Sequence, residues 1–192
     1  LLSSIGIPVI LHGLESVAPK YGITPFKILQ STGHICPKPI SETISRLTDE
    51  HCGWGYVDQS QSFPELYDLL QLRKNMVKRP IISTIEKLLC PIYSEHRHLM
   101  VTGYTHPPYR HKTISLYHHH PLVQEGLIFR GTEGSAQLPL DRRAPFIITT
   151  GQNSNDSFVS PEDYNISKHD RISFDSVTIQ DNVKLGLDAL SG

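Results

Sequence analysis

The chain has 192 residues, of which 38% are hydrophobic and 19% charged, a composition typical of one globular domain able to bury a sizeable core. A formal net charge of −1 gives the whole chain no electrostatic preference for nucleic acid or an anionic membrane. The three cysteines are scattered and lack C-x-x-C spacing, which indicates neither a disulfide framework nor a zinc ribbon and favours a cytoplasmic protein. No apolar run approaches the roughly 20 residues that span a bilayer, so we expect no membrane contact.

Short apolar runs alternate with amphipathic stretches along the chain, which predicts a single α/β domain over residues 1–192 with a largely parallel central sheet flanked by helices. The predicted strands are residues 8–11, 99–103, 127–130 and 145–149. The predicted helices are residues 25–32, 41–49, 64–72, 83–89 and 177–190. Thr24 and Ser41 are the expected caps of the first two helices, and Gly33 is expected to end the first. The polar stretch 151–157 predicts an exposed loop.

Three groups of motifs follow one another between Ile7 and Tyr164. The first is His12-Gly13 after a predicted buried strand, followed by Lys20 and Gly22. The second consists of Leu72-Arg73, Lys78-Arg79-Pro80 and Thr84-Ile85-Glu86-Lys87-Leu88-Leu89-Cys90-Pro91. The third consists of Gly103-Tyr104-Thr105-His106-Pro107-Pro108-Tyr109, Arg130-Gly131-Thr132-Glu133-Gly134 and Pro161-Glu162-Asp163-Tyr164. In this order and spacing they resemble the anthranilate phosphoribosyltransferase family, glycosyl transferase family 3.

The resemblance implies the C-terminal α/β domain of that family, similar to the C-terminal domain of nucleoside phosphorylases. The family's N-terminal helical domain, through which members pair as homodimers, is absent from the sequence, and the chain looks as if it starts in the middle of a domain. The runs Gly55-Tyr56-Val57-Asp58-Gln59-Ser60 and Arg130-Gly131-Thr132-Glu133-Gly134 are similar to a divergent branch. Members of that branch are reported to bind nucleic acid and not to make tryptophan precursors.

Catalysis in the resembled enzymes needs a diphosphate loop and a pair of carboxylates that hold Mg²⁺. Their Gly-Thr-Gly-Gly-Asp loop has no equivalent in these 192 residues, and Ala136-Gln137 stands where the resemblance places the adjacent Asp-Glu pair. Glu133 is the one nearby carboxylate that could contribute to a metal site. We therefore predict no catalytic residue and no cofactor, with Mg²⁺ required only for any residual activity.

The acceptor motif His-Gly-Asn-Arg of the family is matched here by His12-Gly13-Leu14-Glu15. Leu14 cannot donate a hydrogen bond, and Glu15 would repel the carboxylate of anthranilate, which makes anthranilate an unsuitable substrate. His12 and Gly13 remain candidates for ligand binding. Lys20, Arg73 and Arg79 are the cations that could face a phosphate of phosphoribosyl pyrophosphate.

Two alternatives remain open beside a phosphoribosyltransferase-like domain with a degenerate site. Arg73, Lys74, Lys78 and Arg79 form a basic tract that could bind nucleic-acid phosphates without sequence specificity, although solvated lysines at a helix end would give the same pattern. Arg110-His111-Lys112 and Arg142-Arg143 could extend the tract. The other alternative is a fragment of an active transferase with a different acceptor. The run His118-His119-His120 is interpreted as a solvated helix end before Pro121 and not as a metal site.

Overall fold

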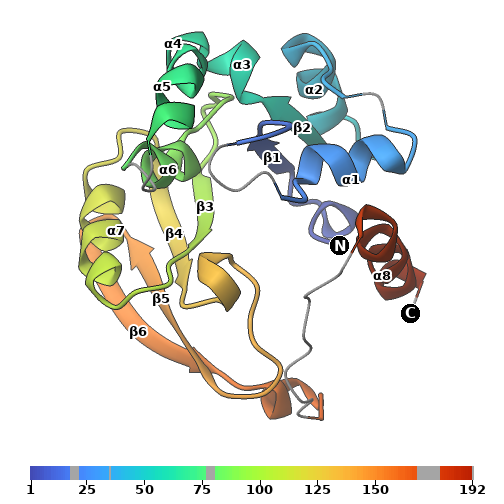
Figure 1. Cartoon of the computed structure of the whole chain (residues 1–192). Helices are drawn as coiled ribbons and strands as arrows, with labels where there is room; N and C mark the ends of the chain where they lie inside the picture. Colours follow the sequence, from blue (N-terminus) through green and yellow to red (C-terminus); the bar gives the residue numbers. More distant parts are fainter. Residues whose placement is uncertain (18–21, 35, 77–80, 168–177, 192) are drawn as a thin grey trace. The chain divides into compact units, whose positions relative to one another are not determined.

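The computed structural model describes residues 1–17, 22–34, 36–76, 81–167 and 178–191, with the side chain of Glu133 left out (Figure 1). Its contacts group into two compact units, which we describe separately. The first unit comprises Leu1–Ile92 and Asp175–Gly192, and the second comprises Tyr93–Phe174.

The first unit is built on two parallel strands, β1 (Val9–Gly13) and β2 (Trp54–Asp58), paired from Val9 opposite Trp54 to Gly13 opposite Asp58. Gly55 lets helix α2 (Ile40–Leu47) approach β2 closely, because a Cβ atom there would lie 2.5 Å from Thr43 Cγ2. The Thr43 hydroxyl also donates a hydrogen bond to the carbonyl of Tyr56, so this contact fixes α2 on the strand. Since the two strands run in the same direction, both carboxyl ends lie at one edge of the pair.

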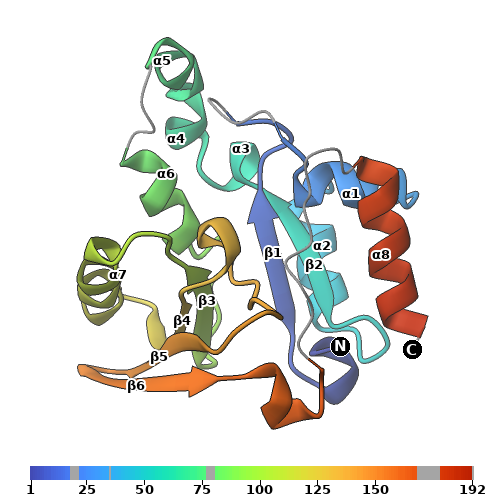
Figure 2. The ribbon, with the colours of Figure 1, turned by 60° about the horizontal axis from the view of Figure 1, so that its bottom comes forward.

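Helices from both ends of the sequence belong to this unit and several pack on the strand pair. Phe26 of α1 (Pro25–Ser31) is buried and packs edge-on against the ring of Tyr56, with 6.0 Å between the ring centroids. Helix α8 (Ile179–Ser191) lies alongside α1 (Figure 2). At the start of α8, Thr178 and Asp181 exchange backbone-to-side-chain hydrogen bonds of 2.8 and 3.1 Å, which lowers the pKa of Asp181. The helical elements of the unit are η1 (Ser3–Ile5), α1 (Pro25–Ser31), α2 (Ile40–Leu47), α3 (Gln59–Ser62), α4 (Pro64–Asp68), α5 (Leu70–Asn75), α6 (Ile82–Ile85), η2 (Glu86–Leu88) and α8 (Ile179–Ser191).

The second unit contains a four-stranded sheet in the order β3-β4-β5-β6. Strands β3 and β4 are parallel, and both of the other pairs are antiparallel. Tyr117 of α7 (Pro108–His118) packs closely on this sheet at Gly126, where an added Cβ atom would lie 2.1 Å from the Tyr117 ring. Ile128 and Ile147 are almost completely buried. The elements are β3 (His98–Gly103), α7 (Pro108–His118), β4 (Val123–Phe129), η3 (Thr132–Gly134), β5 (Ala144–Thr150), β6 (Asn153–Val159) and η4 (Pro161–Tyr164).

The α/β class is confirmed, whereas the sheet arrangement differs from the predicted largely parallel sheet. The described strands form two sheets, and β5 returns to β6 through a turn at Gly151 and Gln152, a connection too short for parallel strands. The predicted loop at 151–157 was therefore wrong, since this polar segment pairs with β5 as the edge strand β6. The prediction of a single domain stays a prediction.

The predicted caps had different outcomes. Thr24 caps α1 as expected, since its hydroxyl accepts a 3.4 Å hydrogen bond from Lys27 N, and Gly33 follows that helix with a φ of +84°. The predicted cap Ser41 lies inside α2, whose cap position is Pro39 and has no side-chain hydrogen bond. The helix predicted over 64–72 is divided into α4 and α5.

Candidate functional site

The carboxyl edge of β1 and β2 brings together residues from two distant parts of the sequence. Gly13 ends β1 opposite Asp58, the last residue of β2, and His12 precedes Gly13. The Asp58 carboxylate accepts a 2.8 Å hydrogen bond from the backbone of Ser60 and so caps α3. Gln59 therefore begins α3 immediately beyond the carboxyl end of the sheet, which is the edge where α/β proteins most often bind ligands.

His12 is held at this edge by the side chain of Gln59. The Gln59 amide nitrogen lies 3.0 Å from His12 Nδ1 and 3.0 Å from the carbonyl oxygen of Glu86. Burial lowers the pKa of His12, so the imidazole is neutral at pH 7. Among the residues that the structure describes, none accepts a hydrogen bond from His12 Nε2. This nitrogen can therefore take a further hydrogen-bond partner.

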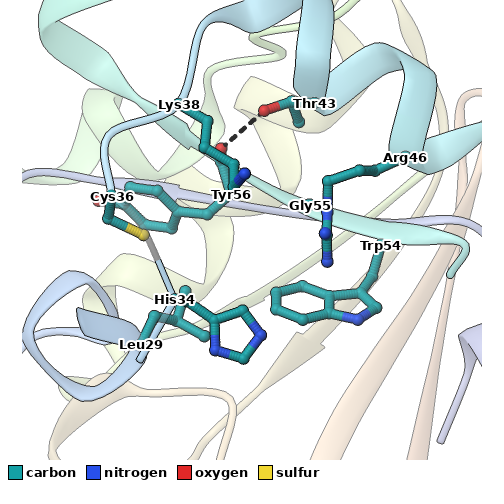
Figure 3. Close-up of a pocket in the computed structure, with 9 residues that line it drawn as sticks. All are labelled: Leu29, His34, Cys36, Lys38, Thr43, Arg46, Trp54, Gly55 and Tyr56. Atoms are coloured by element: carbon teal, nitrogen blue, oxygen red, sulfur yellow. Dashed lines mark hydrogen bonds between the residues drawn. The ribbon is translucent and has the colours of Figure 1, made fainter. Parts of the chain in front are cut away.

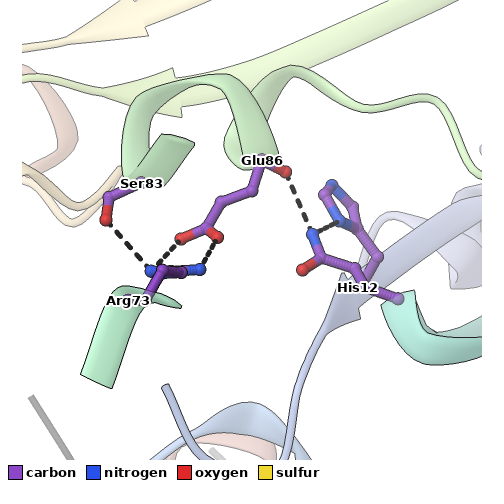
Figure 4. A network of polar contacts seen from close by, with 5 residues as sticks. His12, Arg73, Ser83 and Glu86 are labelled. Carbon is purple, nitrogen blue, oxygen red and sulfur yellow. Dashed lines mark hydrogen bonds and ion pairs between the residues drawn. The ribbon is translucent and has the colours of Figure 1, made fainter. Parts of the chain in front are cut away.

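Arg73 lies in a buried ion pair next to this group (Figure 4). Its guanidinium donates to both carboxylate oxygens of Glu86, at 2.5 and 3.3 Å, and to Ser83 Oγ at 3.0 Å. Only 2% of the Arg73 side chain and 15% of the Glu86 side chain are exposed. Glu86, the first residue of η2, thus holds Arg73 with its carboxylate and Gln59 with its carbonyl, which ties α5 and α3 to η2.

This burial changes the interpretation of the predicted basic tract. Arg73 is enclosed by protein groups and does not offer its guanidinium to a phosphate at the surface, whereas Lys74 on α5 is exposed. Lys78 and Arg79 lie outside the described residues, as does the phosphate candidate Lys20. The stretches 110–112 and 142–143, proposed as extensions of the tract, belong to the second compact unit.

The residues expected near a metal offer no carboxylate pair in the described part of the chain. Ala136 and Gln137 are exposed and follow η3, and the side chain of Glu133 lies outside the description. No group of three histidine, cysteine, aspartate or glutamate side chains suited to a metal occurs among the described residues. Neither a methyl group nor an exposed amide has the charge or the affinity of a carboxylate for Mg²⁺, so Ala136 and Gln137 do not fit this ion.

Leu14 and Glu15 lie just beyond β1, which ends at Gly13. Leu14 is buried with 7% of its surface exposed and contributes to the core, whereas Glu15 is exposed. The carbonyl of Glu15 accepts a 3.0 Å hydrogen bond from the Thr24 hydroxyl, which fixes the backbone here. A carboxylate at this position gives the edge a negative charge.

A hollow beside β2 was not predicted from the sequence (Figure 3). It has an empty volume of about 290 Å³, part of it open to solvent, and is lined by Leu29, His34, Cys36, Lys38, Thr43, Arg46, Trp54, Gly55 and Tyr56. The ring of Trp54 lies 5.3 Å from that of His34, and the Arg46 guanidinium lies 5.2 Å from its centre. Trp54 is half-buried and contacts both of these side chains at the wall of the hollow.

Tyr56 is the unusual residue of this region. Its hydroxyl is buried and has no hydrogen-bond partner within the described part of the chain. Burial, with smaller contributions from Asp58 and Cys36, raises the pKa of Tyr56 strongly, so the hydroxyl stays protonated. It lies 3.4 Å from the position that a Cβ atom on Gly13 would take, which places a hydrogen-bond donor close to the end of β1.

The histidine run at 118–120 lies at the end of α7, whose last residue is His118. His118 bonds to Ser154 Oγ at 2.9 Å, and His119 bonds to the carbonyl of Ser115 at 2.7 Å. The backbone nitrogens of Leu122 and Val123 both donate to His120 Nδ1 at 3.2 Å. The three imidazoles therefore have separate partners.

Among the described residues, no helix has the length and apolar character required to cross a membrane. No protein-family model matches the sequence. The chain is similar to an uncharacterised protein of Aquifex aeolicus (strain VF5), with 26% identity over 152 residues. The match covers 79% of this chain and 42% of the relative, so the chain spans less than half the length of that protein.

Proposed function

We propose that this chain is the α/β part of a phosphoribosyltransferase-like protein of glycosyl transferase family 3, with a degenerate site that binds an oxygen-rich ligand without transferring a phosphoribosyl group to anthranilate. The observation that carries the proposal is the position of His12 and Gly13 at the carboxyl edge of β1, beside the carboxyl end of β2. A neutral imidazole and a backbone without a side chain suit the close approach of a phosphate or ribose oxygen.

The loss of anthranilate transfer is supported by the charges around this edge. Glu15 is exposed where the resembled enzymes carry a cation, and Leu14 is part of the core. Arg73 is neutralised by Glu86 and does not replace that cation. Exposed Ala136 and Gln137 stand where a metal-binding acid pair would be needed. A ligand would thus be held by hydrogen bonds with little metal dependence.

Isothermal titration calorimetry with phosphoribosyl pyrophosphate, with and without Mg²⁺, tests the proposal. We expect weak binding that does not depend on the metal, and no consumption of anthranilate in a fluorescence assay. His12→Ala should abolish the binding, whereas His111→Ala, at an exposed position of α7, should leave it unchanged. Micromolar binding that requires Mg²⁺, or consumption of anthranilate, would contradict the degenerate site.

The nucleic-acid alternative has less support, because the ion pair with Glu86 removes Arg73 from the exposed tract and leaves Lys74 as its exposed described member. The other alternative is an active transferase with a different acceptor. The match covers 42% of the Aquifex relative, so this alternative is a proposal for a longer protein of which this chain would be a part. Transfer assays on a full-length protein would test it.

A further inference from the structure

The amide of Gln59 has a defined orientation. A backbone carbonyl can only accept a hydrogen bond, so the Gln59 group 3.0 Å from the Glu86 carbonyl must be its NH₂. The same NH₂ lies 3.0 Å from His12 Nδ1. Both amide hydrogens are then donated, one to Glu86 and one to His12, which agrees with the burial of Gln59 at 6% exposure.

This orientation determines where the imidazole carries its proton. Nδ1 faces a donor and must therefore be the unprotonated, accepting nitrogen. A neutral imidazole with an unprotonated Nδ1 has its hydrogen on Nε2. An imidazolium would direct a second N–H at the amide NH₂, which disfavours protonation in addition to the cost of burying a charge.

We propose that Gln59 is a positioning residue that holds His12 in the neutral Nε2–H tautomer, so that Nε2 donates a hydrogen bond to a phosphate, carboxylate or carbonyl oxygen of the ligand beyond β1. The ligand part rests on the function proposed above, whereas the tautomer does not. The arrangement also reserves Nδ1 for Gln59, so that His12 cannot bind a metal through that nitrogen while the contact persists.

The charged groups on neighbouring elements leave this arrangement intact. Asp58 at the end of β2 is used in capping α3, through its bond to Ser60. The carboxylate of Glu86 is occupied by Arg73, and only its backbone carbonyl contacts Gln59. Burial is the cause of the lowered pKa of His12. The tautomer is thus set by the amide contact.

Long-range ¹H–¹⁵N correlation spectra of the imidazoles in the ligand-free protein test the role of Gln59. We expect His12 to show a protonated Nε2 and an unprotonated Nδ1 at pH 7. In Gln59→Met, which keeps the length of the side chain and removes both donors, His12 should become a mixture of tautomers. The matched control is Gln61→Met, an exposed position of the same helix. Trp54 fluorescence during urea unfolding establishes that each variant is folded.

A His12 protonated on Nδ1 in the unmodified protein, or an unchanged tautomer in folded Gln59→Met, would overturn the role of Gln59. If Gln59→Met does not fold, Gln59→Glu provides the second variant, because an accepting carboxylate should raise the His12 pKa and protonate Nδ1. An unchanged His12 in that variant would equally overturn the inference.

Titration with phosphoribosyl pyrophosphate and with inorganic phosphate, followed at the same His12 signals, tests the ligand part. We expect the Nε2 proton to shift in the unmodified protein and affinity to fall about threefold to tenfold in Gln59→Met, as for loss of one ordered hydrogen bond. A shift with phosphoribosyl pyrophosphate and not with inorganic phosphate would show that the Nε2 proton requires the larger ligand and that a free phosphate does not suffice. No shift with either would overturn the donor role and the proposed function together, while the tautomer result independently decides the role of Gln59.

Discussion

The substitution Glu86→Gln removes the charge that compensates Arg73 in the first unit. With 2% of its side chain exposed, Arg73 cannot regain water without local unfolding. Breaking a buried ion pair by removing one partner typically costs about 3–5 kcal/mol. The introduced amide would retain one accepting oxygen and the Ser83 contact would remain, so we expect a loss of about 3 kcal/mol in the free energy of unfolding.

Urea unfolding followed by tryptophan fluorescence measures this loss directly, because the single tryptophan of the sequence, Trp54, lies in β2 of the same unit. The matched control is Glu125→Gln, whose partner Arg97 is 73% exposed. Circular dichroism should show a cost below about 1 kcal/mol for that exposed pair. A loss below about 1 kcal/mol in Glu86→Gln would refute the buried-pair argument. The double variant Arg73→Met with Glu86→Leu should regain the stability that Glu86→Gln loses, because it removes both buried charges, and failure to regain it would equally refute the argument.

Three further outcomes follow from buried groups and close contacts. Tyr56→Phe should leave the free energy of unfolding in urea unchanged or raise it by up to about 1–2 kcal/mol, because it removes a buried hydroxyl that has no described hydrogen-bond partner. A clear loss of stability would contradict this. Burial lowers the pKa of His12 in the folded protein below 6.5, so the unfolded chain binds a proton first as the pH falls and the free energy of unfolding should decrease below pH 6.5. His12→Asn should flatten this part of the plot of unfolding free energy against pH, and identical plots for the two proteins would contradict the argument. Gly126→Ala should strongly lower the melting temperature, since its Cβ atom would lie 2.1 Å from a carbon of the Tyr117 ring, whereas Gly186→Ala in α8 meets open space and should stabilise the protein by about 0.5–1 kcal/mol. Equal effects of the two substitutions in circular dichroism melts would refute the close contact.

The predictable parts of the fold are those with strong local signals. The cap at Thr24 followed by Pro25 defines α1, and the apolar runs near β1, β3, β4 and β5 identify those strands, although their ends differ by a few residues. Strand β2 was missed because its run contains Gly55 and ends on Asp58, and its burial comes from α2 packing closely over it. Strand β6 was missed because an edge strand can consist of exposed polar residues when the neighbouring strand supplies its backbone partners.

The candidate site was predictable only in part. His12 and Gly13 follow a recognisable buried strand, so their place at the carboxyl edge could be anticipated. Gln59 carries no motif, and its contact with His12 spans 47 positions of the sequence. Arg73 resembled a surface cation because its neighbours in sequence are charged. Its partner Glu86 lies 13 positions away in the sequence, and the ion pair forms only where α5 meets η2 in the folded structure.

The most direct test of the central claim is the calorimetric titration of this chain with phosphoribosyl pyrophosphate in the presence and absence of Mg²⁺, repeated with His12→Ala. The account predicts weak binding that is independent of the metal and lost in the variant. Tight binding that requires Mg²⁺, or binding that survives the loss of His12, would contradict a degenerate site centred on the carboxyl edge of β1.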